Sequence, residues 1–84
     1  ENPMVKQVED KLTLMYSNDN RITNIHDIRI VSTNNHNLIL FGVSVSIGMT
    51  RKDIFDLETE LQKKLSEEYE NFEIKAKISP IYKN

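Results

Sequence analysis

Every second residue from Ile39 to Ile47 is apolar, and this spacing restricts what the chain can fold into. In an extended strand, one face would carry Ile39, Phe41, Val43, Val45 and Ile47. The other face would carry Leu38, Leu40, Gly42, Ser44 and Ser46. Successive side chains of a strand point to opposite faces of its sheet. We therefore expect a strand that buries its first face in the core of a sheet covered on one side.

Amphipathic helices are predicted both before and after this strand in the sequence. In residues 4–16 the apolar side chains recur at helical spacing, at Val5, Val8, Leu12 and Met15. Pro3 fits the first helical turn, where its missing N–H is not needed. Thr50 and Asp53 form a helix-start pattern, and a second apolar stripe follows at Ile54, Leu57, Leu61 and Leu65. We expect this second helix to end near Asn71.

Two further strands complete the predicted fold. Residues 22–31 are rich in β-branched side chains, and the Asn-rich residues 34–37 suit a hairpin connection. Residues 72–79 alternate again and are closed by Pro80. The order helix, strand, strand, helix, strand predicts an α+β domain with two helices on one face of a three-stranded sheet.

The second face of the predicted sheet is left uncovered. Leu38 and Leu40 lie on it, and we expect Ile28 and Ile30 of the preceding strand to join them in an apolar patch. Such patches mark partner contacts. The alternative is that sheet twist, or Ile81 and Tyr82 near the C-terminus, covers the patch.

Length, charge and cysteine content narrow the class of protein. The 84 residues fit one domain, 1–84. Lys and Arg number 11 against 13 Asp and Glu, so the chain lacks the basic excess that drives nucleic-acid binding. It has no cysteine, which removes disulfides, thiolate zinc sites and thiol catalysis. Because it begins at Glu1, we expect a domain cut from a longer protein.

Few residues are candidates for catalysis or for binding a metal ion. His26 and Asp27 could bind a divalent cation or transfer a proton, but strand neighbours point to opposite faces, so a shared ion is not expected. His36 lies in the Asn-rich turn without an evident carboxylate partner, and Ser44 has no base nearby in the sequence. Asp53 and Asp56 are accounted for by the dipole of the second helix. We expect no enzymatic activity.

A short sequence pattern gives a family resemblance. The run His26-Asp27-Ile28-Arg29 opens a strand, a helix starts near Thr50, and the last strand runs into Ser79-Pro80-Ile81. With this order of elements, the chain resembles the cytoplasmic C-terminal domain of cation diffusion facilitator transporters. The resemblance covers nearly the whole chain and implies a ferredoxin-like, metallochaperone-like fold.

The resemblance also implies a function. In that family a membrane part exchanges a divalent cation such as zinc or manganese for protons. The C-terminal domain lies on the cytoplasmic side of the membrane and pairs with a second copy, and metal tightens the pair. This chain would then be a homodimerisation and regulatory domain whose membrane helices lie elsewhere in the same polypeptide.

The metal site that the resemblance implies is only partly present. The family's histidine at the start of the first strand matches His26, but its other ligand positions fall at Gly42, near Phe55, and at Lys77 and Ser79. Those side chains supply neither imidazole nor carboxylate, whereas a tight zinc site needs three or four ligands. Asp53 and Asp56 flank Phe55 and could substitute there. We expect a weakened cation site.

Two hypotheses follow. The first is the regulatory domain of a cation efflux transporter, paired through strand edges or through the uncovered face at Leu38 and Leu40. The alternative is a free-standing metal-sensing or small-ligand module with the same fold. Several apolar spans of about 20 residues encoded upstream of Glu1 would favour the first.

Overall fold

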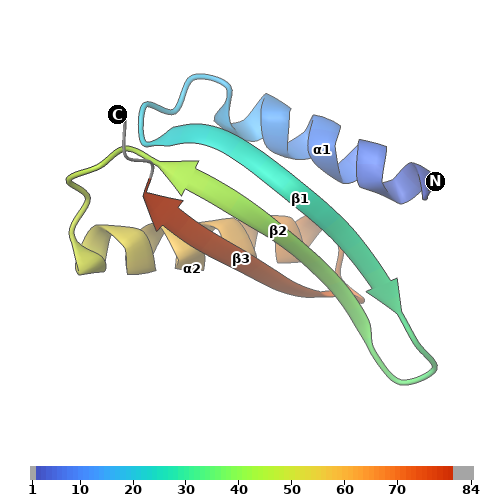
Figure 1. Ribbon diagram of the computed structural model, residues 1–84. Helices are drawn as coiled ribbons and strands as arrows, with labels where there is room; N and C mark the ends of the chain where they lie inside the picture. Colours follow the sequence, from blue (N-terminus) through green and yellow to red (C-terminus); the bar gives the residue numbers. More distant parts are fainter. Residues whose placement is uncertain (1, 81–84) are drawn as a thin grey trace.

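The computed structural model describes residues 2–80, and its elements follow the predicted order. They are α1 (Pro3–Tyr16), β1 (Ile22–Ser32), β2 (Asn37–Val45), α2 (Arg51–Glu68) and β3 (Glu73–Pro80). The strands form one sheet in the order β1-β2-β3, with β2 antiparallel to β1 and parallel to β3. In Figure 1, α2 lies behind the sheet and connects the two parallel strands. The predicted α+β fold is confirmed.

Both helices begin at polar side chains that accept backbone hydrogen bonds. Asn2 accepts the N–H of Met4 at 2.9 Å. Thr50 accepts the N–H of Asp53 at 3.1 Å, and the carboxylate of Asp53 accepts the N–H of Thr50 at 3.2 Å. This reciprocal pair satisfies two N–H groups that the first turn of α2 leaves without helical partners.

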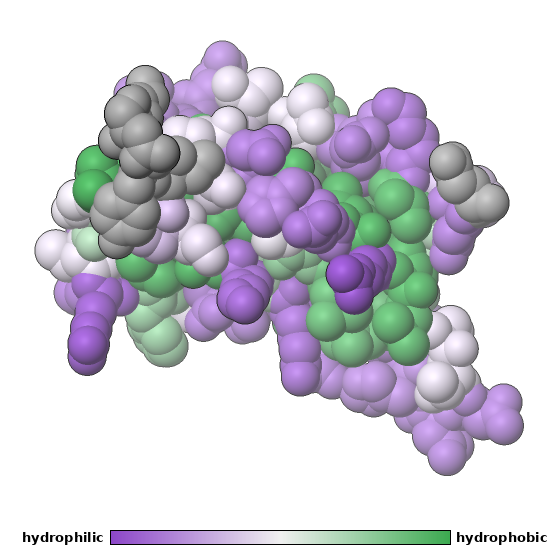
Figure 2. Space-filling model, viewed as in Figure 1, coloured by the Kyte–Doolittle hydropathy of each residue, from purple (hydrophilic) through white to green (hydrophobic). Residues whose placement is uncertain are grey.

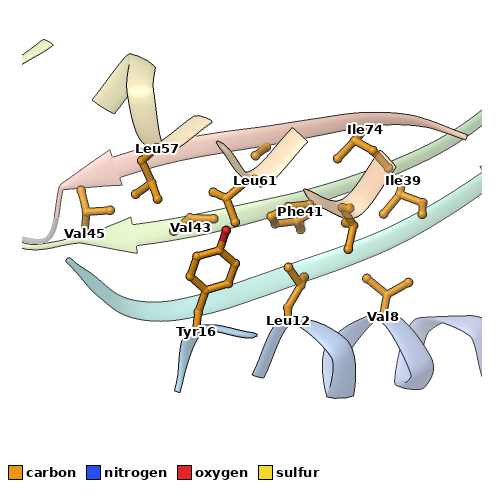
Figure 3. Close-up of a cluster of buried hydrophobic side chains, with 12 residues drawn as sticks. Val8, Leu12, Tyr16, Ile39, Phe41, Val43, Val45, Leu57, Leu61 and Ile74 are labelled. Carbon is orange, nitrogen blue, oxygen red and sulfur yellow. The ribbon is translucent and has the colours of Figure 1, made fainter. Parts of the chain in front are cut away.

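One face of the sheet, the covered face, packs against both helices. Figure 3 shows the β2 side chains between those of the two helices. The core consists of residues from α1, β2, α2 and β3: Val8, Leu12, Tyr16, Ile39, Phe41, Val43, Val45, Leu57, Leu61, Leu65, Ile74 and Ala76. The predicted apolar faces therefore meet in a single cluster.

Two predicted element boundaries were wrong by a few residues. The middle strand ends at Val45, and Ile47, which we expected in the core, is 62% exposed. Gly48 has a φ of 103°, so the chain turns there into α2 and cannot continue as a strand. Helix α2 ends at Glu68 and not near Asn71, because the chain folds back at residues 69–72 to begin β3.

Ile28 and Ile30 do not lie on the uncovered face, contrary to the prediction. Both pack against the core cluster. The pairing of β1 with β2 is interrupted between His26 and Arg29, where β1 contains an extra residue. Such a bulge shifts the alternation of the strand by one, which turns the isoleucines toward the helices.

Candidate functional site on the open face of the sheet

The uncovered side of the sheet, here called the open face, arranges its side chains in rows across the three strands. The row nearest the hairpin joins Val31, Leu38 and Glu73. The next joins Arg29, Leu40 and Lys75. The third joins His26, Gly42 and Lys77, and Ser44 pairs with Ser79 beyond it. The open face thus has an apolar part at the hairpin end and a polar, basic part farther along.

The apolar part is smaller than predicted. Val31 is 41% exposed, and Leu38 and Leu40 are half-buried. Figure 2, viewed as in Figure 1, shows hydrophobic surface on the side that carries the hairpin, with hydrophilic side chains beside it. Leu38 and Leu40 therefore remain candidates for a contact surface, joined by Val31 in place of Ile28 and Ile30. Ile81 and Tyr82, the residues proposed to cover this patch, lie outside the described residues.

His26 is fixed by three neighbours on the open face. Its Nδ1 lies 3.0 Å from Oδ2 of Asp27, and its Nε2 lies 3.0 Å from Oγ of Ser44. The ring also lies against Gly42, where a Cβ atom would come within 2.8 Å of Nδ1. His26 is thus held between two hydrogen bonds, above the one position of β2 that has no side chain.

The contact between His26 and Asp27 corrects the expectation that they point to opposite faces. Asp27 has a φ of 56°, in the left-handed region, where the bulge interrupts the strand. Strand alternation therefore does not apply across this pair. Ser44 was likewise expected to have no base nearby, yet antiparallel pairing brings it to His26 from 18 positions along the chain.

A shallow surface hollow surrounds His26 and extends to the free edge of β3. Its open-face lining includes the basic side chains Arg29, Lys75 and Lys77. Asp27 and Glu58 also line it. The chain as a whole has a net charge of −2, but here three cationic side chains gather around His26. Their positive charge disfavours the binding of a metal cation at this histidine.

Apart from Phe55, the ligand positions implied by the resemblance lie close together, but their side chains do not make a metal centre. Gly42 and Lys77 share a row with His26, and Ser79 lies on the next row. A glycine offers no ligand atom, and a lysine is protonated at neutral pH. Among residues 2–80, no three His, Cys, Asp or Glu side chains come together to hold a metal ion. The described residues therefore do not fit a complete tight zinc site.

Asp53, Asp56 and Phe55 lie apart from His26, on α2. Asp53 caps the helix, and the hydrogen bond from the Thr50 backbone holds its pKa below the usual value. Asp56 pairs with Lys52 at 2.7 Å. Phe55, the position of an implied ligand, is 65% exposed. Helix α2 packs on the covered face, and among residues 2–80 neither acid forms part of a group of three metal-ligating side chains.

A polar cluster on the covered side was missed by the sequence interpretation. Tyr16 donates a hydrogen bond to Glu60 at 3.0 Å, and Arg21 pairs with both Asp19 and Glu60. Burial raises the pKa of Tyr16, and its bond to the carboxylate raises it further. The spacing of Glu60 in the sequence gave no sign of these contacts, which join α1 to α2.

His36 also has a carboxylate partner, contrary to the prediction. Its Nε2 lies 2.9 Å from Oε1 of Glu73, at the start of β3. The register of β2 with β3 brings Glu73 beside the hairpin end, so the pair joins segments distant in sequence. This contact links the hairpin to the edge strand and does not involve His26.

The same fold occurs in a domain of known structure. The chain is similar to the metal-bound C-terminal domain of the CzcD transporter from Thermotoga maritima, with a TM-score of 0.75. The alignment covers 95% of this chain and 93% of that domain at 17% sequence identity. Comparison with protein-family models and with curated proteins found no match. At this identity the likeness establishes the fold, and it agrees with the resemblance inferred from the sequence.

Neither helix within residues 2–80 combines the length and apolar character needed to cross a bilayer.

Proposed function

We propose that this chain is the cytoplasmic regulatory and dimerisation domain of a divalent-cation efflux transporter. The observation that supports this most directly is the match of the whole fold, over 95% of the chain, to the metal-bound C-terminal domain of a transporter. Cation and proton exchange would be carried out by membrane helices of the same polypeptide. The role of this domain would be to bias those helices through the way two copies pair.

The proposed dimer contact is the apolar part of the open face. Val31, Leu38 and Leu40 lie together at the hairpin end, where the described residues leave them partly exposed. Burying them against a second copy would remove apolar surface from water. The basic side chains farther along the face would remain at the edge of such a contact. Water screens the repulsion there between the like charges of the two copies.

The proposed metal site is weak and shared between copies. His26 supplies one imidazole from the open face, whereas Asp53 and Asp56 lie on α2, which packs on the covered face. Carboxylates of a second copy are the oxygen ligands this sequence could offer to zinc or manganese. Such a site would strengthen the dimer only if the metal binds the paired state more tightly than the single chain.

Sedimentation velocity over a concentration series tests both parts. The chain is measured with chelator, then with excess zinc or manganese. We expect a monomer–dimer equilibrium that metal shifts toward dimer in the unmodified chain but not in His26→Ala. Asp53→Asn and Asp56→Asn, measured singly, identify which carboxylate contributes. Association that ignores metal in every variant would contradict the metal-sensing role and favour a constitutive contact.

The contact surface is tested separately by Leu40→Asp. A carboxylate in the middle of the apolar patch should weaken association at least about tenfold, since burying an unpaired charge is costly. Leu14→Asp is the matched control, because Leu14 is exposed on α1 and outside the patch. Equal association of Leu40→Asp and the unmodified chain would place the interface elsewhere.

A free-standing sensing module is the second candidate function. It is favoured by the surface hollow beside Gly42, whose basic lining suits a small anionic ligand. The coding sequence upstream of Glu1 separates the candidates. Several apolar segments of about 20 residues would support the transporter, and a start codon close to Glu1 would support the module.

A further inference from the structure

The two outer strands of the sheet differ in how well their free edges can receive another strand. The strand order is β1-β2-β3, so β1 and β3 each have one edge without a neighbouring strand among residues 2–80. The pairing of β1 is interrupted between Ile22 and Asn24 and again between His26 and Arg29. The pairing of β3 is regular over all eight of its residues. Because bulges twist an edge away from further pairing, the free edge of β3 is the better template.

The backbone of β3 has hydrogen-bonding groups to offer at this edge. An edge strand bonds to its sheet on one side and presents a row of N–H and C=O groups on the other. No other backbone segment among residues 2–80 bonds to that row. The surface hollow around His26 follows the same edge, because the five consecutive residues from Lys75 to Ser79 line it. In Figure 1, β3 borders the sheet on the side opposite β1. An extended segment could therefore lie in the hollow and pair with β3.

An added strand would place its side chains on two different surfaces. Alternate side chains of a strand point to opposite faces of the sheet. One set would lie on the open face beside Lys75 and Lys77, both of which are exposed. The other set would lie beside Glu58 and Gln62 of α2, which are half-buried where they line the hollow. Acidic side chains suit the first set, and uncharged hydrogen-bonding side chains suit the second.

The cationic side chains of the hollow are available for such a contact. Within residues 2–80, neither Arg29 nor Lys77 forms an ion pair. Lys75 lies 3.8 Å from the carboxylate of the first residue of β3, and its side chain is 60% exposed. The acids that line the hollow are Asp27, on β1, and Glu58, on α2. A carboxylate placed beside the two lysines would thus be attracted by charges that no closer acid neutralises.

The same lysines disfavour a second copy of β3 at this edge. Two β3 strands paired edge to edge would bring Lys75 and Lys77 of one copy against the same lysines of the other. Like charges opposite each other on paired strands destabilise the pairing. This repulsion protects the edge from self-association and at the same time selects a partner of opposite charge.

We propose that the free edge of β3 binds an extended acidic peptide segment by strand addition, with acidic side chains at alternate positions beside Lys75 and Lys77. The backbone groups of residues 74–79 supply the affinity, and the lysines supply the specificity. This binding requires no metal ion, and it is separate from the apolar contact proposed for the dimer at Leu38 and Leu40.

Titration of the nitrogen-15-labelled chain with a synthetic peptide tests the proposal by NMR. The peptide alternates glutamate with threonine, is blocked at both ends and matches the eight residues of β3 in length. We expect amide shifts concentrated at residues 74–79. A control peptide with lysine in place of glutamate should bind at least about tenfold more weakly. Equal binding of the two peptides, or no binding of the glutamate peptide, would overturn the proposal.

Charge reversal in the chain tests the two lysines. Lys75→Glu combined with Lys77→Glu changes only exposed side chains. This double variant should bind the glutamate peptide at least about tenfold more weakly and the lysine peptide more tightly. The matched control is Lys63→Glu, because Lys63 is exposed on α2 and does not line the hollow. A loss of the same size in the control would reveal an effect of net charge alone and would contradict the role of β3.

Two N-methylated forms of the glutamate peptide test strand addition itself. N-methylation removes a backbone donor, and methyl groups on alternate residues block one edge of the peptide only. We expect one form to bind like the unmodified peptide and the other to lose binding, because a single edge of the peptide meets β3. If both forms bind as tightly as the unmodified peptide, charge attraction operates without strand pairing, and the proposal is wrong.

Two further measurements identify other occupants of the edge. Glutarate, a free dicarboxylate, is titrated in place of the peptide. If it binds as tightly and shifts the same amides, the hollow is a small-anion site and the peptide proposal fails. The chain is also measured alone over a concentration series. Shifts at residues 74–79 that grow with its concentration would place a second copy at the edge, which would likewise overturn the proposal.

Discussion

The two faces of the sheet are stabilised by different kinds of interaction. On the covered face, β2 side chains such as Ile39 and Val43 are fully buried between the helices. On the open face, the side chains one position along, Leu40 and Gly42, lie beside basic and polar neighbours. Packing fixes the first set through shape and apolar contact, whereas on the open face hydrogen bonds and one backbone bulge fix His26. The covered face therefore accounts for the fold, whereas the open face carries the candidate site.

This division explains how the fold can match that of a metal-bound transporter domain at 17% identity. A core tolerates many apolar substitutions that keep its volume and pattern. A metal site does not tolerate replacement of its ligands, because coordination needs particular atoms in a particular geometry. Gly42 and Lys77 can thus stand where the sequence resemblance implies ligands without affecting the packing beneath them.

The largest predicted effect comes from substituting adjacent residues of β2 on opposite faces. Ile39→Ala should lower the free energy of unfolding by about 3 kcal/mol, because Ile39 is fully buried and its loss leaves a cavity. Leu40→Ala should lower it by less than about 1 kcal/mol, since Leu40 is only half-buried. Urea denaturation measures both. Equal losses at dilute concentration would show that the open face is also covered in the monomer.

A smaller effect is expected at the start of α2. Thr50→Ala removes the hydroxyl that accepts the N–H of Asp53 and should cost about 1 kcal/mol. Thr50→Ser keeps that hydrogen bond and serves as the control. If both variants lose the same stability by thermal unfolding, the methyl group of Thr50, and not its capping hydroxyl, is what matters.

The smallest effect is expected in the polar cluster that joins the helices, and it depends on pH. Burial acts to raise the pKa of Glu60, but hydrogen bonds from Tyr16 and Arg21 outweigh it and hold the pKa below the usual 4.5. Glu60 therefore stabilises the folded state above about pH 4.5, and this contribution is lost as the pH falls through its folded pKa.

Glu60→Gln tests this contribution. At pH 7 we expect a loss of roughly 1 kcal/mol or less, because a third of the Glu60 side chain is exposed. The difference from the unmodified chain should shrink as thermal unfolding is measured from pH 6 to pH 3. Glu58→Gln, nearby on the same helix, controls for the general loss of a negative charge. A difference that stays constant with pH would contradict the role of the carboxylate.

Much of the fold could be predicted because local patterns and global packing agree. The periodicity of Val8 and Leu12, the capping pair at Thr50 and the alternation through Phe41 each indicated the element that forms. The errors fell where a single residue changes the geometry. Ile47 follows the strand pattern but comes just before Gly48, whose positive φ turns the chain. Ile28 follows a bulge that the sequence pattern did not reveal.

The candidate site could be predicted less well because its contacts are not local. His26 was identified by residue type and position, but its partner Ser44 comes from another strand. The distances from Tyr16 to Glu60 and from His36 to Glu73 likewise depend on how the elements pack. No spacing rule along one strand or helix contains that information.

The sequence by itself determined the order of elements, the apolar faces that meet in the core and the position of the single strand histidine. These depend on propensity and periodicity, which act over a few neighbouring residues. Only the tertiary structure decided which way the residues after the bulge face, and that His26 lies between Asp27 and Ser44 above Gly42. Those features arise from strand register and backbone conformation, which are set by the packing of the whole sheet.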